Sequence, residues 1–203
     1  MVIFDCYGVQ ITQQCKCMQI FKNFLLFFSF MPELKRKGDW MQTYTGKKFW
    51  PLDPRSEEIN IEDIAHSLAF SCRFNGHCNK FYSVAQHSVF VSTLVRPSEV
   101  LAALLHDSAE AYLGDIISPL KIYLPNILEI EKNLKKIIFQ YFDIKEYDKQ
   151  EIIRADKVAL YTEMRDIMGK PPETWKEFEH YSQLLPKQKI VPISPKKKRN
   201  LVS

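Results

Sequence analysis

Residues 106–121 read HDSAEAYLGDIISPLK, and the first two of them place polar side chains on an apolar helical pattern. His106 and Asp107 directly follow Ala-Ala-Leu-Leu at positions 102–105, which indicates a buried helix at this point. An ionised carboxylate is costly to bury unless it is paired or bound to a metal. This stretch therefore predicts a helical protein that encloses a polar site.

The rest of the stretch supplies further charged side chains around that site. Glu110 lies one helical turn after His106, so it can project over the same site without being a direct metal ligand. Gly114 is expected to end the helix, Asp115 returns a carboxylate to the mouth of the site, and Lys121 offers a cation. A metal with additional acids and nearby cations suits the hydrolysis of a phosphate ester.

Two other expected helices present polar residues on their inward faces. In the helix that opens at Ser83, the inward face reads Val84, His87, Val91 and Leu94. In the helix that opens at Asp148, the inward face reads Ile152, Asp156, Ala159, Leu160 and Glu163. Two histidines and two aspartates therefore point inward from three helices, and this donor set suits a divalent first-row cation. A buried network of histidine and aspartate without metal is the alternative.

The apolar periodicity predicts an all-α, bundle-like domain of about six helices. The expected helices begin at Asn60, Ser83, Pro97, Asn126, Asp148 and Pro172. The third is expected to run unbroken to Gly114, and the last to about Leu185. No stretch alternates as a strand does. We expect residues 42–188 to form this domain, residues 1–41 to be a poorly ordered extension, and residues 189–203 to be a disordered basic tail.

Composition and charge exclude several classes of protein. The chain has 203 residues, of which 46% are apolar and 26% charged, and these values exclude a mostly disordered or collagen-like chain. Between Pro186 and Ser203 there are six basic residues and no acids, so the preceding residues carry a net charge of −2. The total charge of +4 therefore belongs to the tail and does not indicate a nucleic-acid-binding face.

Cysteine usage and the apolar run near the N-terminus bear on the compartment. The five cysteines form no C-x-x-C pair and predict a reduced, cytoplasmic protein: Cys6, Cys15, Cys17, Cys72 and Cys78. The apolar run at residues 21–31 is too short to cross a bilayer, which needs roughly 20 residues. A membrane-touching segment, an apolar flap packed on the body, and a later translation start at Met18, Met31 or Met41 are the alternatives to a poorly ordered extension.

The order His87, His106-Asp107 and Asp156 resembles the H…HD…D signature of HD-domain metal-dependent phosphohydrolases. Around these residues, Gln86-His87-Ser88, residues 106–121 and Arg154-Ala155-Asp156 are similar to the 5′-deoxynucleotidase (YfbR-like) branch of that family. They resemble still more closely the small phage and bacterial HD phosphohydrolases, some of which hydrolyse dATP. The resemblance covers about residues 42–170.

The resemblance implies an all-helical HD fold and a role for each matching residue. It implies a divalent metal (Mn, Co, Zn or Mg) held by His87, His106, Asp107 and Asp156. Glu110 is expected to orient or activate the attacking water, with Asp115 as a second catalytic acid. The expected substrate contacts are an arginine–aromatic pair, a loop histidine and a lysine: Arg73, Phe74, His77 and Lys121.

We therefore expect a metal-dependent phosphohydrolase that acts on a deoxynucleoside monophosphate or triphosphate by attack of metal-activated water on phosphorus. The expected partner is the nucleotide substrate, with neither nucleic acid nor membrane, and assembly into a homo-oligomer is left open. A catalytically inactive HD module that binds a nucleotide or a protein is the alternative. A cyclic-dinucleotide or alarmone hydrolase is less favoured because such enzymes usually bring extra domains or further metal ligands.

Overall fold

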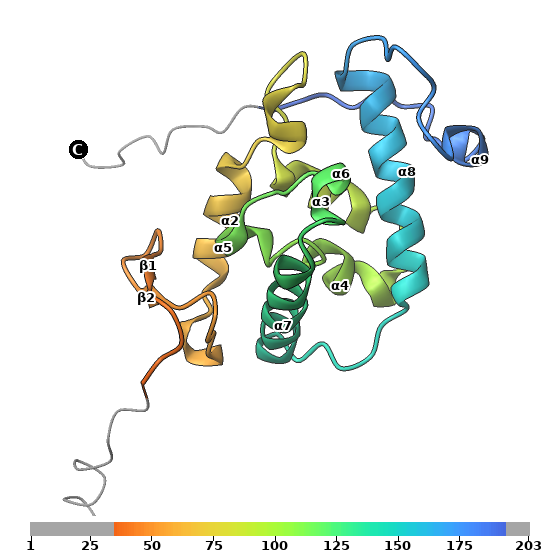
Figure 1. Ribbon diagram of the computed structural model, residues 1–203. Helices are drawn as coiled ribbons and strands as arrows, with labels where there is room; N and C mark the ends of the chain where they lie inside the picture. Colours follow the sequence, from red (N-terminus) through yellow and green to blue (C-terminus); the bar gives the residue numbers. More distant parts are fainter. Residues whose placement is uncertain (1–34, 194–203) are drawn as a thin grey trace, which may run out of the picture. The chain divides into compact units, whose positions relative to one another are not determined.

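The computed structural model describes residues 35–193, and helices make up most of its regular structure (Figure 1). This confirms the prediction of an all-α fold in its coarse form. The described residues from Lys37 onward belong to one compact unit. Among the described helices, none combines the length and the apolar character that a membrane crossing requires. The expectations for residues 1–34 and for the tail from residue 194 lie outside the described residues.

The regular elements of the described chain are, in order, β1 (Met41–Gln42), β2 (Lys48–Phe49), η1 (Ser56–Glu58), α2 (Ile61–Phe70), η2 (Arg73–Gly76), α3 (Val84–Ser92), η3 (Pro97–Glu99), α4 (Val100–Leu104), α5 (Glu110–Leu113), α6 (Ser118–Lys121), α7 (Pro125–Tyr141), α8 (Lys149–Ile167) and α9 (Phe178–Ser182).

Side-chain caps confirm three of the expected helix starts. Oδ1 of Asn60, Oγ of Ser83 and Oδ1 of Asp148 accept backbone N–H groups from the first turns of α2, α3 and α8. These caps satisfy donors that have no partner within the helix. The fourth expected start is confirmed within one residue, because α7 begins at Pro125 rather than at Asn126.

The expected single helix from Pro97 to Gly114 is wrong. The structure divides it into η3, α4 and α5, with a tight turn at residues 105–109, in which the N–H of Ser108 donates to the Leu105 carbonyl at 3.0 Å. On a regular α-helix, adjacent side chains point about 100° apart. The tighter turn allows His106 and the residue after it to face the same site.

The structure also differs from the expectation at both ends of the domain. Strands β1 and β2 form an antiparallel hairpin in which Met41 pairs with Phe49, so the prediction of no strands is wrong there. Each strand has two residues, which is too short to show alternation. The last helix, expected from Pro172 to Leu185, is reduced to α9 because Glu177 has a left-handed φ of 63° that a right-handed helix excludes. The short helix α6 was not expected.

The hydrophobic core consists of two clusters, and α3 contributes to both. The first cluster packs residues of α2, α5 and α7 around Val84, and the second packs residues of α4, α7 and α8 around Val91. His87 lies one turn from each of these valines and is completely buried. The core therefore holds this histidine from both directions along α3.

The described end of the chain lies against α3 and α8. The backbone N–H of Ile193 donates to the Gln86 side chain at 2.8 Å, and that of Ile190 donates to Asp166 at 2.9 Å. Residues 189–193 of the expected disordered tail are thus held on the helical body, and the remainder of the tail lies outside the described residues.

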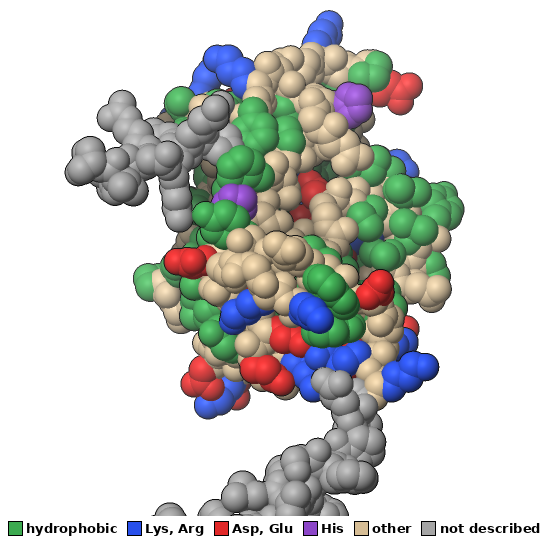
Figure 2. Space-filling model, turned by 90° about the vertical axis from the view of Figure 1, so that its left-hand side faces the viewer, with side chains coloured by type: hydrophobic (Ala, Val, Ile, Leu, Met, Phe, Trp, Pro, Cys, Tyr) green, Lys and Arg blue, Asp and Glu red, His purple; other side chains and the backbone are tan. Residues whose placement is uncertain are grey.

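On the face that Figure 2 turns toward the viewer, charged side chains of both signs gather in the lower part, below a more apolar surface.

Candidate metal centre

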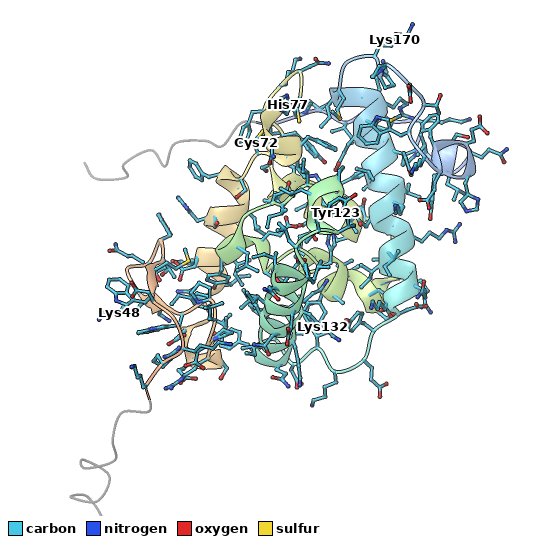
Figure 3. All side chains as sticks on the ribbon, in the orientation of Figure 1. Lys48, Cys72, His77, Tyr123, Lys132 and Lys170 are labelled. Carbon is cyan, nitrogen blue, oxygen red and sulfur yellow. The ribbon has the colours of Figure 1, made fainter. Side chains whose placement is uncertain are left out.

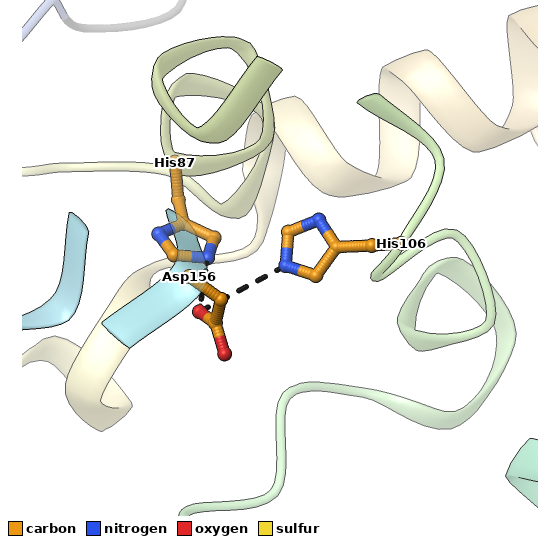
Figure 4. Close-up of side chains that lie close together, drawn as sticks. All are labelled: His87, His106 and Asp156. Carbon is orange, nitrogen blue, oxygen red and sulfur yellow. Dashed lines mark ion pairs between the residues drawn. The ribbon is translucent and has the colours of Figure 1, made fainter. Parts of the chain in front are cut away.

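Three side chains from distant parts of the sequence converge on one point. His87 comes from α3, His106 from the turn after α4, and Asp156 from α8 (Figure 4). One potential ligand atom from each lies within 4.8 Å of the other two. Asp156 Oδ1 is 3.1 Å from His87 Nε2 and 3.9 Å from His106 Nε2. Ligands that each lie about 2 Å from a metal are roughly 3–4 Å from one another, so this spacing suits a single cation.

Asp107 brings a fourth donor to the cluster. Its Oδ2 lies 3.1 Å from His106 Nε2 and 3.5 Å from His87 Nε2. The two histidines are buried, whereas Asp107 exposes 18% and Asp156 42% of the side chain. The structure therefore places the four predicted ligands together, with the carboxylate side of the cluster open to solvent.

The hydrogen bonds of the two histidines leave the atoms that face the cluster free. Nδ1 of His106 lies 2.7 Å from the Ala103 carbonyl, which can only accept, so Nδ1 carries the hydrogen. Nδ1 of His87 lies 2.6 Å from Oε1 of Glu163. Both Nε2 atoms are buried without a hydrogen-bond partner, since their approaches to the carboxylates lack hydrogen-bond geometry. Two ring nitrogens that make no hydrogen bond, each 3.1 Å from a carboxylate oxygen, fit a divalent cation.

Glu163 is the functional residue that sequence reasoning left without a role. It lies two helical turns after Asp156 on α8, its side chain is fully buried, and its two oxygens contact different partners. Oε1 contacts His87, and Oε2 accepts from Arg73 at 3.0 Å. Burial raises the pKa of Glu163, but His87 and Arg73 outweigh it and hold that pKa below its usual value. In the sequence, the signal that could have identified Glu163 was its position on the inward face of α8.

The same contacts determine the charge of His87. Burial lowers the pKa of His87, but the carboxylate of Glu163 outweighs this effect and raises it to about 10. Burial likewise opposes ionisation of Asp107, yet the two histidines and Arg73 hold its pKa well below the usual value. Without metal, both ring nitrogens of His87 are therefore protonated at neutral pH, and Nε2 faces Oδ1 of Asp156 at 3.1 Å. A cation bound at Nε2 would displace the proton on that nitrogen.

Glu110, at the start of α5, is a buried acid beside the cluster. Its Oε2 has no hydrogen-bond partner, and its Oε1 lies 3.7 Å from Nζ of Lys121. Burial, followed by the charges of Asp107 and Asp115, raises the pKa of Glu110 to about 9. Asp115 is half-buried, and burial raises its pKa as well. Lys121 is also bound to Glu131, whose Oε2 lies 2.6 Å from Nζ.

The expected substrate contacts on η2 are only partly near the cluster. Arg73 is buried, pairs with Glu163, and has its Nη1 3.9 Å from Oδ2 of Asp107. The ring of Phe74 lies 5.2 Å from the Arg73 guanidinium carbon. His77 is exposed at the end of η2, where its N–H donates to the Phe74 carbonyl at 3.0 Å (Figure 3). The structure brings Arg73 to the cluster but leaves His77 on the outside of the loop.

The cluster opens into a large cavity. Its volume is about 1180 Å³, and its walls include His106, Asp107 and Asp156 together with Lys121 and much of α7. Ligand pockets for small molecules typically measure about 300–1,000 Å³. The cavity is therefore large enough for a nucleotide next to the candidate metal site.

The fold and the site define a predominantly helical protein with a candidate centre for a divalent metal. No protein-family model matches the chain. The chain is 39% identical over 128 residues to the uncharacterized protein YfdR of Escherichia coli K12, an alignment that covers 63% of this chain and 72% of YfdR. It is 35% identical over 147 residues to the uncharacterized protein RCAP_rcc00048 of Rhodobacter capsulatus, covering 66% of this chain and 75% of that protein. The chain belongs to the family of these proteins.

Proposed function

We propose that this protein is a divalent-metal-dependent phosphohydrolase of the HD-domain type that acts on deoxynucleotides. The observation that carries the proposal is the pair of buried Nε2 atoms of His87 and His106, which make no hydrogen bond and each lie 3.1 Å from a carboxylate oxygen, of Asp156 and of Asp107 respectively. The order of these four residues in the sequence, which resembles the HD signature, supports the same function.

The protein itself supplies orientation and charge at this site. A bound divalent cation supplies Lewis acidity, which lowers the pKa of water and polarises a phosphoryl oxygen. Glu163 orients His87, and the Ala103 carbonyl orients His106, so each ring presents Nε2. The guanidinium of Arg73, whose Nη1 lies 3.9 Å from Oδ2 of Asp107, would stabilise negative charge that develops on a phosphoryl group bound at the cluster.

Glu110 is the residue that transfers a proton in this proposal. Burial keeps its carboxyl group protonated in the absence of metal, and a nearby divalent cation lowers its pKa toward the working range. A carboxyl group whose pKa lies near the working pH can take a proton from the attacking water and return it to the leaving group. Lys121, between Glu110 and Glu131, adds a cation on the same side.

A phosphate-release assay tests the proposed function. Deoxynucleoside monophosphates and triphosphates are incubated with the protein and Mn²⁺, Co²⁺, Mg²⁺ or Zn²⁺. We expect release with at least one metal, and loss of release when a chelator removes the metal. A metal-loaded protein that releases no phosphate from any of these substrates would contradict the proposal and favour an inactive nucleotide-binding module.

A further inference from the structure

Helix α7 forms a wall of the cavity that contains the metal cluster, and Lys135 is part of that wall. Lys135 lines the cavity together with His106, Asp107 and Asp156. The side chain is half-buried, with Nζ 5.5 Å from the centre of the Phe139 ring. Among the described residues, no carboxylate oxygen lies within 4.0 Å of Nζ of Lys135, which is the longest distance that counts as an ion pair. Lys135 is thus a partly buried cation without an anionic partner.

Two other lysines that line the same cavity have carboxylate partners. Lys121 lies 2.6 Å from Glu131, and Lys145 lies 2.9 Å from Asp143. Burial lowers the pKa of Lys135, and the carboxylates of the site only partly oppose this effect. An anion bound in the cavity would relieve that cost.

Lysine is repeated on this side of α7. Lys132, Lys135 and Lys136, which we call the α7 lysines, all line the cavity, and their spacing of three and four residues puts them on one helix face. Figure 3 shows Lys132 on α7. A phosphate chain that begins at the metal cluster and extends toward α7 would carry several negative charges past this face.

We propose that Lys135, supported by the other α7 lysines, binds the phosphate groups of a linear phosphate chain beyond the group held at the metal. The preferred ligand is then a nucleoside triphosphate rather than a monophosphate. This inference rests on the proposed nucleotide site, and it specifies the class of substrate that the site takes.

Binding measurements on a variant with suppressed turnover test the subsite. In the Glu110→Gln background with Mn²⁺ present, calorimetry compares dATP, dAMP and inorganic tripolyphosphate, with and without Lys135→Gln. Loss of a charge-assisted hydrogen bond should weaken dATP binding by roughly tenfold or more and leave dAMP binding unchanged. Lys170→Gln is the control, because it removes the same charge from an exposed position just beyond the C-terminal end of α8 (Figure 3).

The three ligands separate the outcomes. Weaker binding of tripolyphosphate together with dATP supports recognition of the bare chain, and weaker binding of dATP alone supports recognition of the chain as part of a nucleotide. Equal effects on dATP and dAMP, or no effect on either, would overturn the proposal. Because the readout is binding, a Lys135-dependent preference for dATP in a protein that releases no phosphate would refute the proposed hydrolysis but keep the subsite. Phosphate release from dAMP, combined with no Lys135-dependent preference for dATP in binding, would support the proposed hydrolysis and refute the subsite.

Discussion

Replacing Glu110 by glutamine should reduce turnover by about 10²–10⁴-fold, the usual loss when a general acid or base is removed. Glutamine keeps the shape of the side chain but cannot exchange a proton. Bound metal should stay unchanged, because Glu110 lies outside the cluster of His87, His106, Asp107 and Asp156. Steady-state phosphate release together with elemental analysis of the purified variant measures both quantities.

Glu129→Gln is the matched control for this variant. Glu129 is an exposed acid that lines the same cavity, so its replacement makes the same chemical substitution in that cavity without touching the buried acid. We expect turnover in the control to stay close to that of the unaltered protein. Turnover near that level in Glu110→Gln would contradict the account and shift the proton-transfer role to Asp115.

The second large effect is expected at Glu163. Replacing it by alanine should lower the free energy of unfolding by about 3–5 kcal/mol, the usual cost of removing one partner of a buried ion pair. The side chain of Glu163 is fully buried, and its removal leaves the charges of Arg73 and His87 without their shared carboxylate. Urea unfolding of the metal-free protein, followed by circular dichroism, measures the change.

Glu163→Gln and Glu173→Ala complete this test. The glutamine variant keeps the volume but loses the charge, so it should stay folded and bind metal about 10–100-fold more weakly, as expected when a partner of a histidine ligand is lost. Glu173 is exposed, and its replacement by alanine should change stability only slightly. An unfolding free energy of Glu163→Ala equal to that of Glu173→Ala would show that the buried pair contributes nothing.

The parts of the site that could be predicted from sequence are those with a local signal. His87 and Asp156 stand out because each interrupts a regular apolar face, and the caps at Ser83 and Asp148 fix where those helices begin. Cap residues and helical periodicity act over one or two turns, so a single sequence reveals them.

The parts that could not be predicted depend on tertiary contacts. The turn at residues 105–109 breaks a helix whose apolar pattern continues through it. Arg73 is recognisable as a cation, but its pairing with Glu163 joins residues 90 positions apart. Lys135 follows the buried Leu134 in a lysine-rich helix, and only the fold turns it toward the cavity. The β1–β2 hairpin is too short for a periodic signal.

The metal centre is the central claim, and crystals grown with Mn²⁺ test it most directly. An anomalous difference map recorded above the manganese absorption edge locates the ion without reference to activity. The account predicts a peak bounded by Nε2 of His87, Nε2 of His106 and Oδ1 of Asp156, with Asp107 adjacent. A map without a peak at that position, from crystals whose protein retains these side-chain positions, would contradict it.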